Sequence, residues 1–422
     1  MSVGETTVPV PHDSRDRDPY ANWDPRAQYP IDGYGTRDPY PELAELRRTM
    51  PVGKRRGWSS TGQPEDAFSV YRFDDVVAVL RDSVTFSSAS IREGMGVVMG
   101  PYVLVGMDEP EHKRLRSLVA QAFRQKTLAH WEDELVVGVV DEVIDTFIDR
   151  GRAELVREFT FRYPVQVIAA ILGLPRADHA QFHQWANAII NVSADPVVGI
   201  RSSQQLREYL VGILDDRRRA PRDDFVSELA GAELDGERLG DEEIFSFLRL
   251  LLPAGAETTY RATGNFLFGL LSNPDQLDAL RADRSLMTQA VEEAIRWETP
   301  LLITSRVATV DTAIAGTPIP AGMQVTPHVG SANRDDTRWE HADEFDIFRE
   351  QKPLASFGMG PHMCLGMHLA RMEMRAAVNR LFDRCAGLRF DPDAMEHDDP
   401  HIHGETFRSP TTLPVVFDAR AG

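Results

Sequence analysis

Residues 357–366 read FGMGPHMCLG and form the most distinctive stretch of this sequence. Gly358, Gly360 and Pro361 fall within four residues, which is incompatible with regular secondary structure and predicts a tight loop. Leucines, alanines and methionines at helical spacing over 367–382 predict a helix directly after it. Cys364 would then lie just before a helix N-terminus, where free amides and the helix dipole favour a thiolate over a thiol.

Cys364 is open to several roles when it is considered by itself. A lone cysteine is often a small buried apolar residue, which is the interpretation we give to Cys385. A catalytic nucleophile would need a base nearby, and the sequence does not exclude one. A zinc site is disfavoured, because His362 and His368 have no second cysteine at ligand spacing. Haem iron needs only one thiolate and a bend that leaves the nearby amides free.

A helical pattern over 241–272 predicts the longest helix of the chain. Its middle is weakened, because Pro253 lacks a backbone donor and costs roughly 3 kcal/mol in a helix interior. Gly255 weakens it further, and the Thr258 hydroxyl can turn back to the carbonyl of Ala254. This segment is therefore either a kinked core helix or a helix opened for a functional purpose.

The cysteine loop matches F-x-x-G-x-x-x-C-x-G and resembles the haem-binding signature of the cytochrome P-450 family of haem-thiolate monooxygenases. Three further segments resemble motifs of this family and follow in its order: His112 with Arg116 (H-x-x-x-R), Ala254-Gly255-Ala256-Glu257-Thr258 (A-G-x-[DE]-T) and Glu293-Ala294-Ile295-Arg296 (E-x-x-R). Their spacing is similar to that of soluble bacterial members. The resemblance implies a haem b cofactor, with Cys364 as the axial ligand of its iron.

The resemblance also implies which other residues surround the haem. The residues implied to bind the cofactor are His112, Arg116, Ala254, Arg306, His362 and Gly366. His112 and Arg116 are four residues apart and share a helical face, as contact with one propionate edge requires. Arginine suits a carboxylate through its forked donors, although any one of these cations alone is more typical of a solvated surface.

Two further groups have implied roles. Glu257 and Thr258 are the implied catalytic pair, since a hydroxyl that holds water beside a carboxylate can pass protons into a dry pocket. Pro253 replaces the commoner aliphatic residue there, which puts the width of the oxygen groove in doubt. Glu293 and Arg296 share a helix face and are implied to form a buried structural network with Arg349. Without the resemblance, a solvated surface pair would be the simpler interpretation.

The chain as a whole predicts a mainly α fold with a small β part. Short β-branched segments at 305–310, 312–315 and 323–328 predict strands, and 411–417 is a further candidate. A helical pattern also covers 131–149. By resemblance the long helix crosses over the haem and the cysteine loop lies below it. We expect a mobile N-terminal arm over 1–38 and a single domain over 39–422.

Composition narrows the class of protein. Of 422 residues, 42% are hydrophobic, which is typical of a globular chain. Lys plus Arg number 46 and Asp plus Glu 65, so the net charge of −19 disfavours nucleic acid and anionic membranes as partners. Two cysteines exclude a disulfide framework, and no apolar run could span a bilayer. We expect a cytoplasmic protein.

The resemblance predicts insertion of one atom of O2 into an apolar organic substrate by hydroxylation, dealkylation or epoxidation. Electrons would come from a separate ferredoxin and its NAD(P)H-dependent reductase, because the chain has no flavin or iron–sulfur motif. Substrate would contact 87–106, parts of 169–191 and 301–305, and glycines in the first stretch suggest a moving loop. A basic patch for an acidic ferredoxin would include Lys113, Arg114, Arg371 and Arg375.

Other functions remain open at this point. The same fold could serve a peroxide-driven enzyme, against which Glu257 and Thr258 argue, or a non-enzymatic haem-thiolate sensor or carrier. A helical cysteine hydrolase without haem is the alternative from another class. His397, His401 and His403 could bind a metal, but their aspartate-rich surroundings favour a solvated loop.

Overall fold

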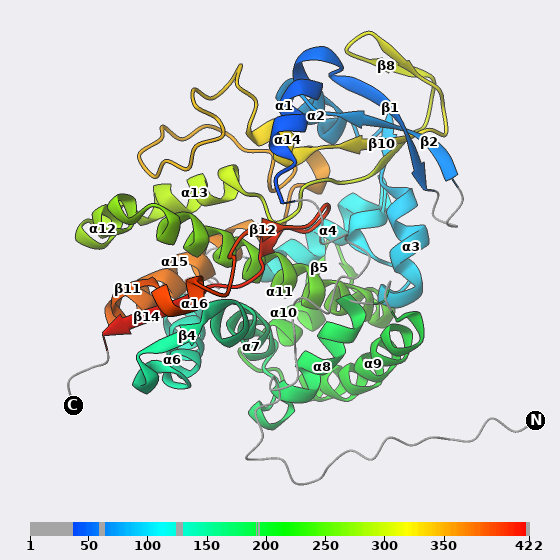
Figure 1. Ribbon diagram of the computed structural model, residues 1–422. Coiled ribbons are helices and arrows are strands. Elements are labelled where there is room, and N and C mark those ends of the chain that lie inside the picture. Colours follow the sequence, from blue (N-terminus) through cyan, green and yellow to red (C-terminus); the bar gives the residue numbers. More distant parts are fainter. Residues whose placement is uncertain (1–36, 59–63, 124–129, 191, 193–194, 419–422) are drawn as a thin grey trace, which may run out of the picture.

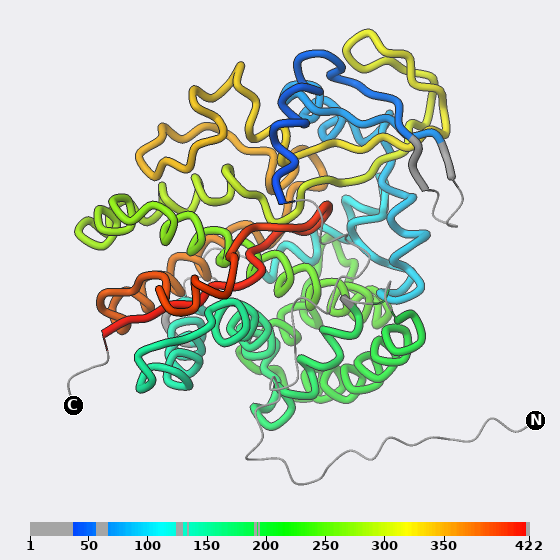
Figure 2. The backbone as a smooth tube through the Cα atoms, in the orientation of Figure 1, coloured from blue at the N-terminus to red at the C-terminus, as the bar shows by residue number. Residues whose placement is uncertain are grey.

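Helix α11 (Asp241–Ser272) runs through the middle of the molecule (Figures 1 and 2). The structure is a computed structural model that describes residues 37–58, 64–123, 130–190, 192 and 195–418. The helix has the bounds predicted from the sequence, and Pro253 lies inside it without ending it. Most of its side chains are buried, because α7 (Arg162–Ile171) and α15 (Met367–Arg384) pack against it. Such a helix can place residues along one line through the core.

Helices make up most of the described chain. The others are α1 (Tyr40–Thr49), α2 (Phe73–Arg81), α3 (Ala89–Met99), α4 (Glu111–Val119), α6 (Val137–Asp145), α8 (His179–Ile190), α9 (Pro196–Arg219), α10 (Phe225–Gly231), α12 (Pro274–Ala282), α13 (Met287–Trp297), α14 (Val329–Asn333) and α16 (Pro392–Met395). The mainly α class predicted from the sequence is confirmed. No helix in these described ranges is long and apolar enough to cross a membrane.

Two predicted segments differ from the structure. The pattern over 131–149 is not one helix but a π-helical turn (Glu132–Val136), α6 and a 3₁₀ turn that ends at Gly151 with a φ of +64°. The stretch 87–106 is not a glycine-rich loop, because α3 occupies most of it. Gly94 and Gly96 lie inside this helix, so tertiary packing outweighs their low helix propensity.

The largest sheet lies at one side of the helices (Figure 1). A five-stranded sheet has the order β1-β2-β10-β7-β3, with β1 (Val52–Trp58), β2 (Pro64–Val70), β10 (Gln324–Pro327), β7 (Arg306–Ala308) and β3 (Phe86–Ser87). In it, β2 pairs antiparallel with β1 and parallel with β10, with Ala67 opposite Gln324. A three-stranded sheet joins β11 (Ala386–Phe390), β14 (Pro414–Asp418) and β4 (Arg152–Glu154).

Three small hairpins complete the strands of the described chain: β5 (Glu233–Leu234) with β6 (Glu237–Arg238), β8 (Thr312–Ile314) with β9 (Thr317–Ile319), and β12 (Ile402–His403) with β13 (Ser409–Pro410). The strands predicted near 305–328 and at the C-terminal end are present. The sequence analysis missed β1 and β2, whose polar residues hide their alternation.

The apolar core is dominated by the helices. One cluster of buried side chains extends from Val98 in α3 to Phe417 in β14, and a second lies under the five-stranded sheet. The predicted N-terminal arm falls outside the described residues except for Arg37 and Asp38.

Candidate functional site: a cavity between α11 and the cysteine loop

The loop at 357–366 has the tight geometry that its sequence predicts. Gly358 and Gly360 have φ values of +70° and +71°, which favour glycine. A Cβ on Gly360 would lie 2.8 Å from the Cα of Arg81, so this part of the loop packs directly on α2. The backbone N–H of Cys364 donates to the carbonyl of Phe357 over 2.8 Å, and α15 begins at Met367. The loop therefore holds the cysteine in a fixed place beside a helix N-terminus.

Cys364 opens into a cavity of about 330 Å³. Burial raises the pKa of its thiol, while the backbone N–H of Gly366 and the charges of Arg116 and Arg371 act in the opposite direction. A Cβ on Gly366 would meet only the Cys364 Sγ, at 4.0 Å, so the space beside the sulfur is open for a flat ligand.

The other wall of the cavity is the weakened middle of α11. Ala254, Gly255 and Thr258 line it, and the Thr258 hydroxyl donates to the Ala254 carbonyl over 2.7 Å, as the sequence suggested. The remaining walls are mostly apolar and include Ile91, Leu104, Val105, Phe123, Phe247, Leu250, Leu251, Leu301 and Val329. Of the three predicted substrate-contacting stretches, 87–106 and 301–305 contribute, but none of the described residues 169–190 does.

Four nitrogen-bearing side chains also reach this cavity: His112, Arg116, Arg306 and His362. The rings of His112 and His362 stack with their centroids 4.0 Å apart. Burial lowers the pKa of both histidines, that of His362 to about 3, with the neighbouring cations adding to the effect at His362. Burial also lowers the pKa of Arg306 to about 10. Of these four side chains, His112 has a carboxylate partner in the described chain, with Nδ1 3.1 Å from Glu109 Oε1, and the other three have none.

These donors fit a ligand that carries carboxylates. The Nε2 atoms of His112 and His362 are buried without a hydrogen-bond partner. Within the described chain, Arg116 and Arg306 form no ion pair and donate instead to the carbonyls of Met363 and Ser305. A haem brings two propionates, an apolar ring and an iron that accepts one thiolate, so the residues present fit this cofactor.

Glu257 lies differently from the expectation. Its side chain does not line the cavity but is buried against Arg261, one turn along α11, with Oε1 2.7 Å from Nε. Neighbouring residues of a helix point about 100° apart. Thr258 therefore faces the cavity while Glu257 faces away from it. The two residues do not form a ready-made pair inside the cavity.

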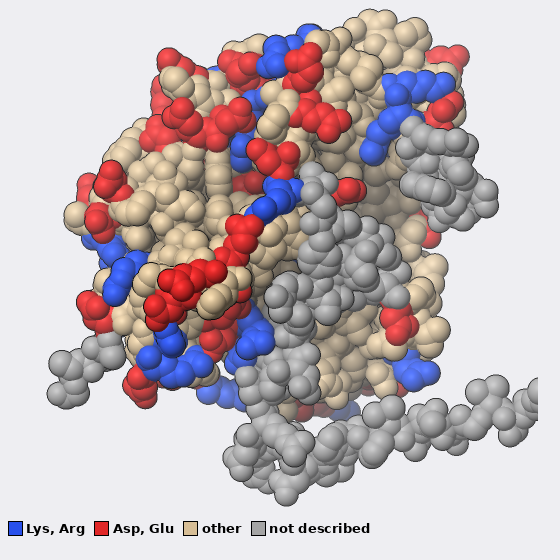
Figure 3. Space-filling model, in the orientation of Figure 1, with Lys and Arg blue, Asp and Glu red and all other residues tan. Residues whose placement is uncertain are grey.

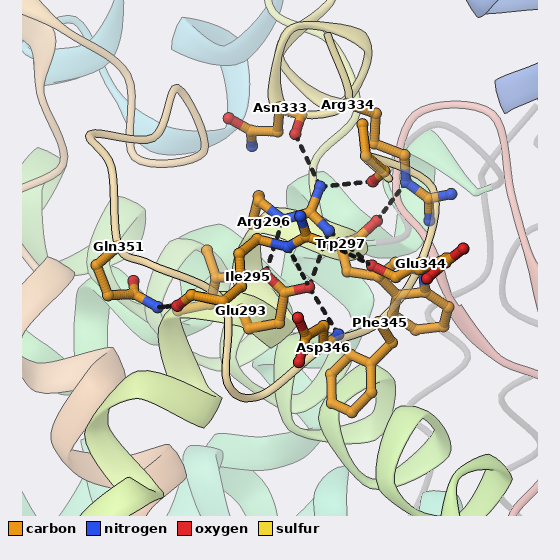
Figure 4. A network of polar contacts seen from close by, with 12 residues as sticks. Glu293, Ile295, Arg296, Trp297, Asn333, Arg334, Glu344, Phe345, Asp346 and Gln351 are labelled. Carbon is orange, nitrogen blue, oxygen red and sulfur yellow. Dashed lines mark hydrogen bonds and ion pairs between the residues drawn. The ribbon is translucent and has the colours of Figure 1, made fainter. Parts of the chain in front are cut away.

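Glu293 and Arg296 form the centre of a buried network (Figure 4). Arg349 also pairs with Glu293. Arg296 binds both carboxylate oxygens of Glu293, with contacts of 2.7 and 2.8 Å, and Arg349 Nε lies 3.2 Å from Glu293 Oε1. Arg296 also donates to the carbonyls of Asn333, Ala342 and Glu344. The network ties α13 to the irregular segment that leads to the cysteine loop.

The four cations predicted to attract a ferredoxin are mostly neutralised. Arg114 pairs with Glu243, Arg371 with Glu292 and Arg375 with Glu132. Lys113 is exposed and forms no ion pair within the described part of the chain. On the face drawn in Figure 3, basic side chains likewise lie among acidic ones. The basic patch expected from the sequence is thus reduced, since three of its four cations have carboxylate partners.

The three C-terminal histidines do not make a metal site in the described ranges. His403 is buried in the β12–β13 hairpin, where Nδ1 lies 3.0 Å from the Ser409 carbonyl oxygen. His401 Nδ1 lies 2.6 Å from the Asp399 carbonyl oxygen, and His397 is exposed. The solvated-loop interpretation holds for His397 but not for His403.

Comparison with known proteins shows which family shares this arrangement of residues. The sequence profile described as Cytochrome P450 matches residues 199–398. The erythromycin C-12 hydroxylase of Saccharopolyspora erythraea is 37% identical over 83% of this chain and 88% of that protein. The chain belongs to the cytochrome P450 family. Cytochrome P450 monooxygenase PikC of Streptomyces venezuelae is 34% identical, over 87% of this chain and 89% of that protein.

Solved cytochromes P450 have the same fold. The structure of CYP109Q5 from Chondromyces apiculatus superposes with a TM-score of 0.83 at 33% identity, covering 96% of this chain and 99% of that one. CYP109E1 from Bacillus megaterium, in complex with testosterone, gives a TM-score of 0.81 at 29% identity, over 90% and 99% of the two chains. This protein is thus a cytochrome P450 monooxygenase, a family that uses haem.

The structure also brings a residue to the cavity that the sequence analysis did not select. Glu373 of α15 lines it together with Leu369, Ala370 and Met374. The sequence signal that could have identified Glu373 is its position as a single acidic residue on an otherwise apolar helix face, four residues after Leu369.

Proposed function

We propose that this cytochrome P450 binds haem b and inserts one atom of O2 into an apolar organic substrate. Electrons would reach it singly from a ferredoxin and its NAD(P)H-dependent reductase. The observation that carries the proposal is a single cavity that Cys364 and Thr258 both line, with His112, Arg116, Arg306 and His362 also facing it. Its mostly apolar walls suit an apolar substrate.

The residues have distinct proposed roles around the cofactor. Cys364 would hold the iron, and the two arginines and two histidines would hold the propionates. The buried Nε2 atoms of His112 and His362 have no other hydrogen-bond partner. When bound, haem supplies the thiolate-ligated iron at which O2 is activated. Ala254 and Gly366 leave room for the ring on its two sides. Glu293, Arg296 and Arg349 keep the loop that carries Cys364 in register with α13.

Thr258 is proposed to hold a water molecule through which protons enter the cavity. Its hydroxyl now donates to Ala254, and a water in the cavity can accept from it or donate to it after a small rotation. Glu257 can serve as the proton source of the pair only if its carboxylate leaves Arg261 and turns toward the cavity. We propose that this exchange occurs during turnover, because a buried ion pair cannot release a proton while both groups stay charged.

Thr258→Ala is expected to bind haem and substrate but to consume NAD(P)H mainly without forming product. The alanine cannot hold the water through which protons reach the reacting oxygen. The measurement is the yield of product and of hydrogen peroxide per NAD(P)H consumed. Thr258→Ser, which keeps the hydroxyl, should restore most of the yield. If Thr258→Ala formed as much product per NAD(P)H consumed as the wild type, Thr258 would not have this role.

The relatives suggest large, mostly apolar substrates. They include the erythromycin C-12 hydroxylase, a steroid C26-monooxygenase of Rhodococcus jostii and the testosterone-bound CYP109E1. A peroxide-driven reaction is the second candidate in the same cavity. The Thr258 hydroxyl favours the O2-dependent reaction, because peroxide already contains the protons that Thr258 would deliver.

The ferredoxin is proposed to recognise Lys113 more than the paired arginines. Lys113→Glu should slow reduction of the enzyme by reduced ferredoxin, and the difference from wild type should shrink as salt is added. Arg371 and Arg375 already have carboxylate partners, so their exposed charge is smaller. Stopped-flow reduction rates at several ionic strengths test this, with Lys54→Glu in β1 as the charge-matched control. Equal rates for Lys113→Glu and wild type at every salt concentration would contradict it.

A further inference from the structure

A second cavity, of about 560 Å³, lies among the described residues and shares no lining residue with the cavity at Cys364. It is formed by α1, by residues near the ends of α11 and α13, and by the segments at 334–343 and 401–408. Tyr40, Phe268 and Trp297 give it aromatic walls, and Arg334 and Arg408 border it as well. A concave site with apolar walls and a few converging charges is typical of a place where a small molecule binds.

The charges that are buried around the second cavity are unequal. Arg334 and Arg408 are 5% and 1% exposed, and the one buried acid among the described lining residues is Glu298. Glu298 accepts from Arg408 over 2.8 Å and from the hydroxyl of Tyr40 over 2.6 Å. Burial and the charge of Glu298 raise the pKa of Tyr40, which therefore keeps the hydrogen that it donates. One buried positive charge is left in excess.

The excess charge lies at Arg334. Its guanidinium carbon is 3.4 Å from the ring centroid of Tyr40, and its Nε donates to the Trp297 carbonyl over 2.7 Å (Figure 4). Within the described chain its two terminal nitrogens have only long contacts, 3.6 Å to Glu298 Oε2 and 3.5 Å to Asp343 Oδ1. Hydrogen bonds between such ionised groups normally measure about 2.7–2.9 Å. The forked edge of this arginine is thus weakly used and suits a closer anion.

Acidic side chains at the rim do not cancel this charge. Asp38 and Asp343 also line the second cavity, but both are exposed to water, which screens them together with dissolved salt. Arg37, at the same rim, already pairs with Asp399. The buried side of the cavity therefore favours an anion, while the aromatic walls favour a flat apolar body.

We propose that the second cavity binds a small organic carboxylate with a flat apolar body, and that its occupancy changes the affinity for ligands in the cavity at Cys364. The carboxylate accepts from the two terminal nitrogens of Arg334, and the apolar body lies among the aromatic walls. This goes beyond the proposed monooxygenase function, which needs only the cavity at Cys364.

One short segment connects the two cavities. Leu301 lines the cavity at Cys364 and follows Pro300, whose carbonyl accepts from the backbone N–H of Arg408 over 2.9 Å. The side chain of Arg408 binds Glu298, the same carboxylate that Arg334 approaches. A carboxylate ligand that draws Arg334 away from Glu298 therefore acts on the contacts that position this segment. Two sites that bias the same segment change each other's affinity by the same factor.

The first test is a calorimetric titration with 2-naphthoate, using haem-loaded protein whose iron is saturated with 4-phenylimidazole so that the cavity at Cys364 is occupied. One 2-naphthoate should bind per chain, and the neutral 2-naphthamide should bind at least tenfold more weakly. Arg334→Gln should weaken binding of 2-naphthoate about tenfold or more, because it removes charge-assisted hydrogen bonds, and should leave 2-naphthamide unaffected.

Asp343→Asn keeps the test decisive if Arg334→Gln does not fold. Asp343 is exposed, and removal of its charge should tighten the binding of 2-naphthoate about two- to fivefold, because Arg334 loses a competing carboxylate. Glu340→Gln is the charge-matched control, since Glu340 is exposed in the same segment but does not line the cavity. No binding of 2-naphthoate, equal affinity for the acid and the amide, or equal effects of Asp343→Asn and Glu340→Gln would overturn the proposed site.

The coupling is measured by titrating 4-phenylimidazole through the shift of the Soret band, at increasing concentrations of 2-naphthoate. The affinity for 4-phenylimidazole should change about fivefold and then reach a plateau, and the change should disappear in Arg334→Gln. An unchanged affinity would overturn the coupling. A change without a plateau would show direct competition at the iron and would overturn it as well. None of these measurements depends on turnover, so their failure would leave the proposed monooxygenase function untouched.

Discussion

Cys364→Ser is expected to abolish monooxygenase activity and to weaken or abolish haem binding. A serine hydroxyl is not ionised at neutral pH and is a poor ligand for haem iron, whereas a thiolate both holds the iron and pushes electron density toward cleavage of the O–O bond. The open space beside the sulfur, between Cys364 and Gly366, would remain, so the loss would come from the ligand and not from a blocked site. Haem content after purification and product formation measure the effect.

Cys385→Ala is the matched control for this experiment. Cys385 is fully buried at the end of α15, lines no part of the cavity, and burial raises the pKa of its thiol to about 12. Its replacement should lower stability slightly and leave haem binding and activity in place. An active, haem-loaded Cys364→Ser protein would refute the assignment of the axial ligand.

Glu293→Ala is expected to lower the free energy of unfolding by about 3–5 kcal/mol, the cost of breaking a buried ion pair by removing one partner. Glu293 is 1% exposed, accepts from Arg296 and Arg349, and also accepts from the backbone N–H of Asp346 over 2.9 Å. Without it, two buried guanidinium groups would lose their carboxylate. Chemical denaturation monitored by circular dichroism measures the change, with haem content as a second readout.

Glu292→Ala provides a control on the preceding residue. Glu292 pairs with Arg371, but both side chains are partly exposed, at 17% and 25%. Its loss should cost no more than about 1 kcal/mol, as for other surface pairs. Equal destabilisation by the two substitutions would contradict the structural role given to Glu293.

Local sequence signals predicted the parts of the fold that depend on backbone chemistry. Helix α11 was predicted with its observed bounds, and the cysteine loop was predicted because Gly358 and Gly360 have few alternatives to a turn. The arginines and histidines around the cavity were predicted from the family motifs and not from the hydrophobic periodicity of the sequence. His112 and Arg116, spaced four apart, do face one cavity with His362 and Arg306.

The differences concern the partners of charged side chains. Glu257 was expected beside Thr258, but Arg261, four residues on along the same helix, binds its carboxylate, a local pairing that the sequence analysis overlooked. Arg371 and Arg375 were expected to be free cations, and Glu292 and Glu132 neutralise them from segments distant in sequence. No local rule predicts these two partners.

Strands β1 and β2 were missed for a related reason. Strand β2 joins the sheet by pairing with β10, which lies more than 250 residues away in the sequence, as the alignment of Ala67 with Gln324 shows, and β1 is attached through β2. Likewise, the position of Glu373 on an apolar helix face did not place it in the site until α15 was seen to border the cavity. Propensity describes a segment, whereas pairing and burial depend on what the rest of the chain brings to it.

The central claim is that the thiolate of Cys364 binds the iron of a haem in this cavity. The most direct measurement is the absorption spectrum of the purified protein after reduction and addition of carbon monoxide. We expect a strongly red-shifted Soret band in wild type and none in Cys364→Ser. A protein that stays colourless after being supplied with hemin, or one whose Soret band is not shifted, would contradict the account.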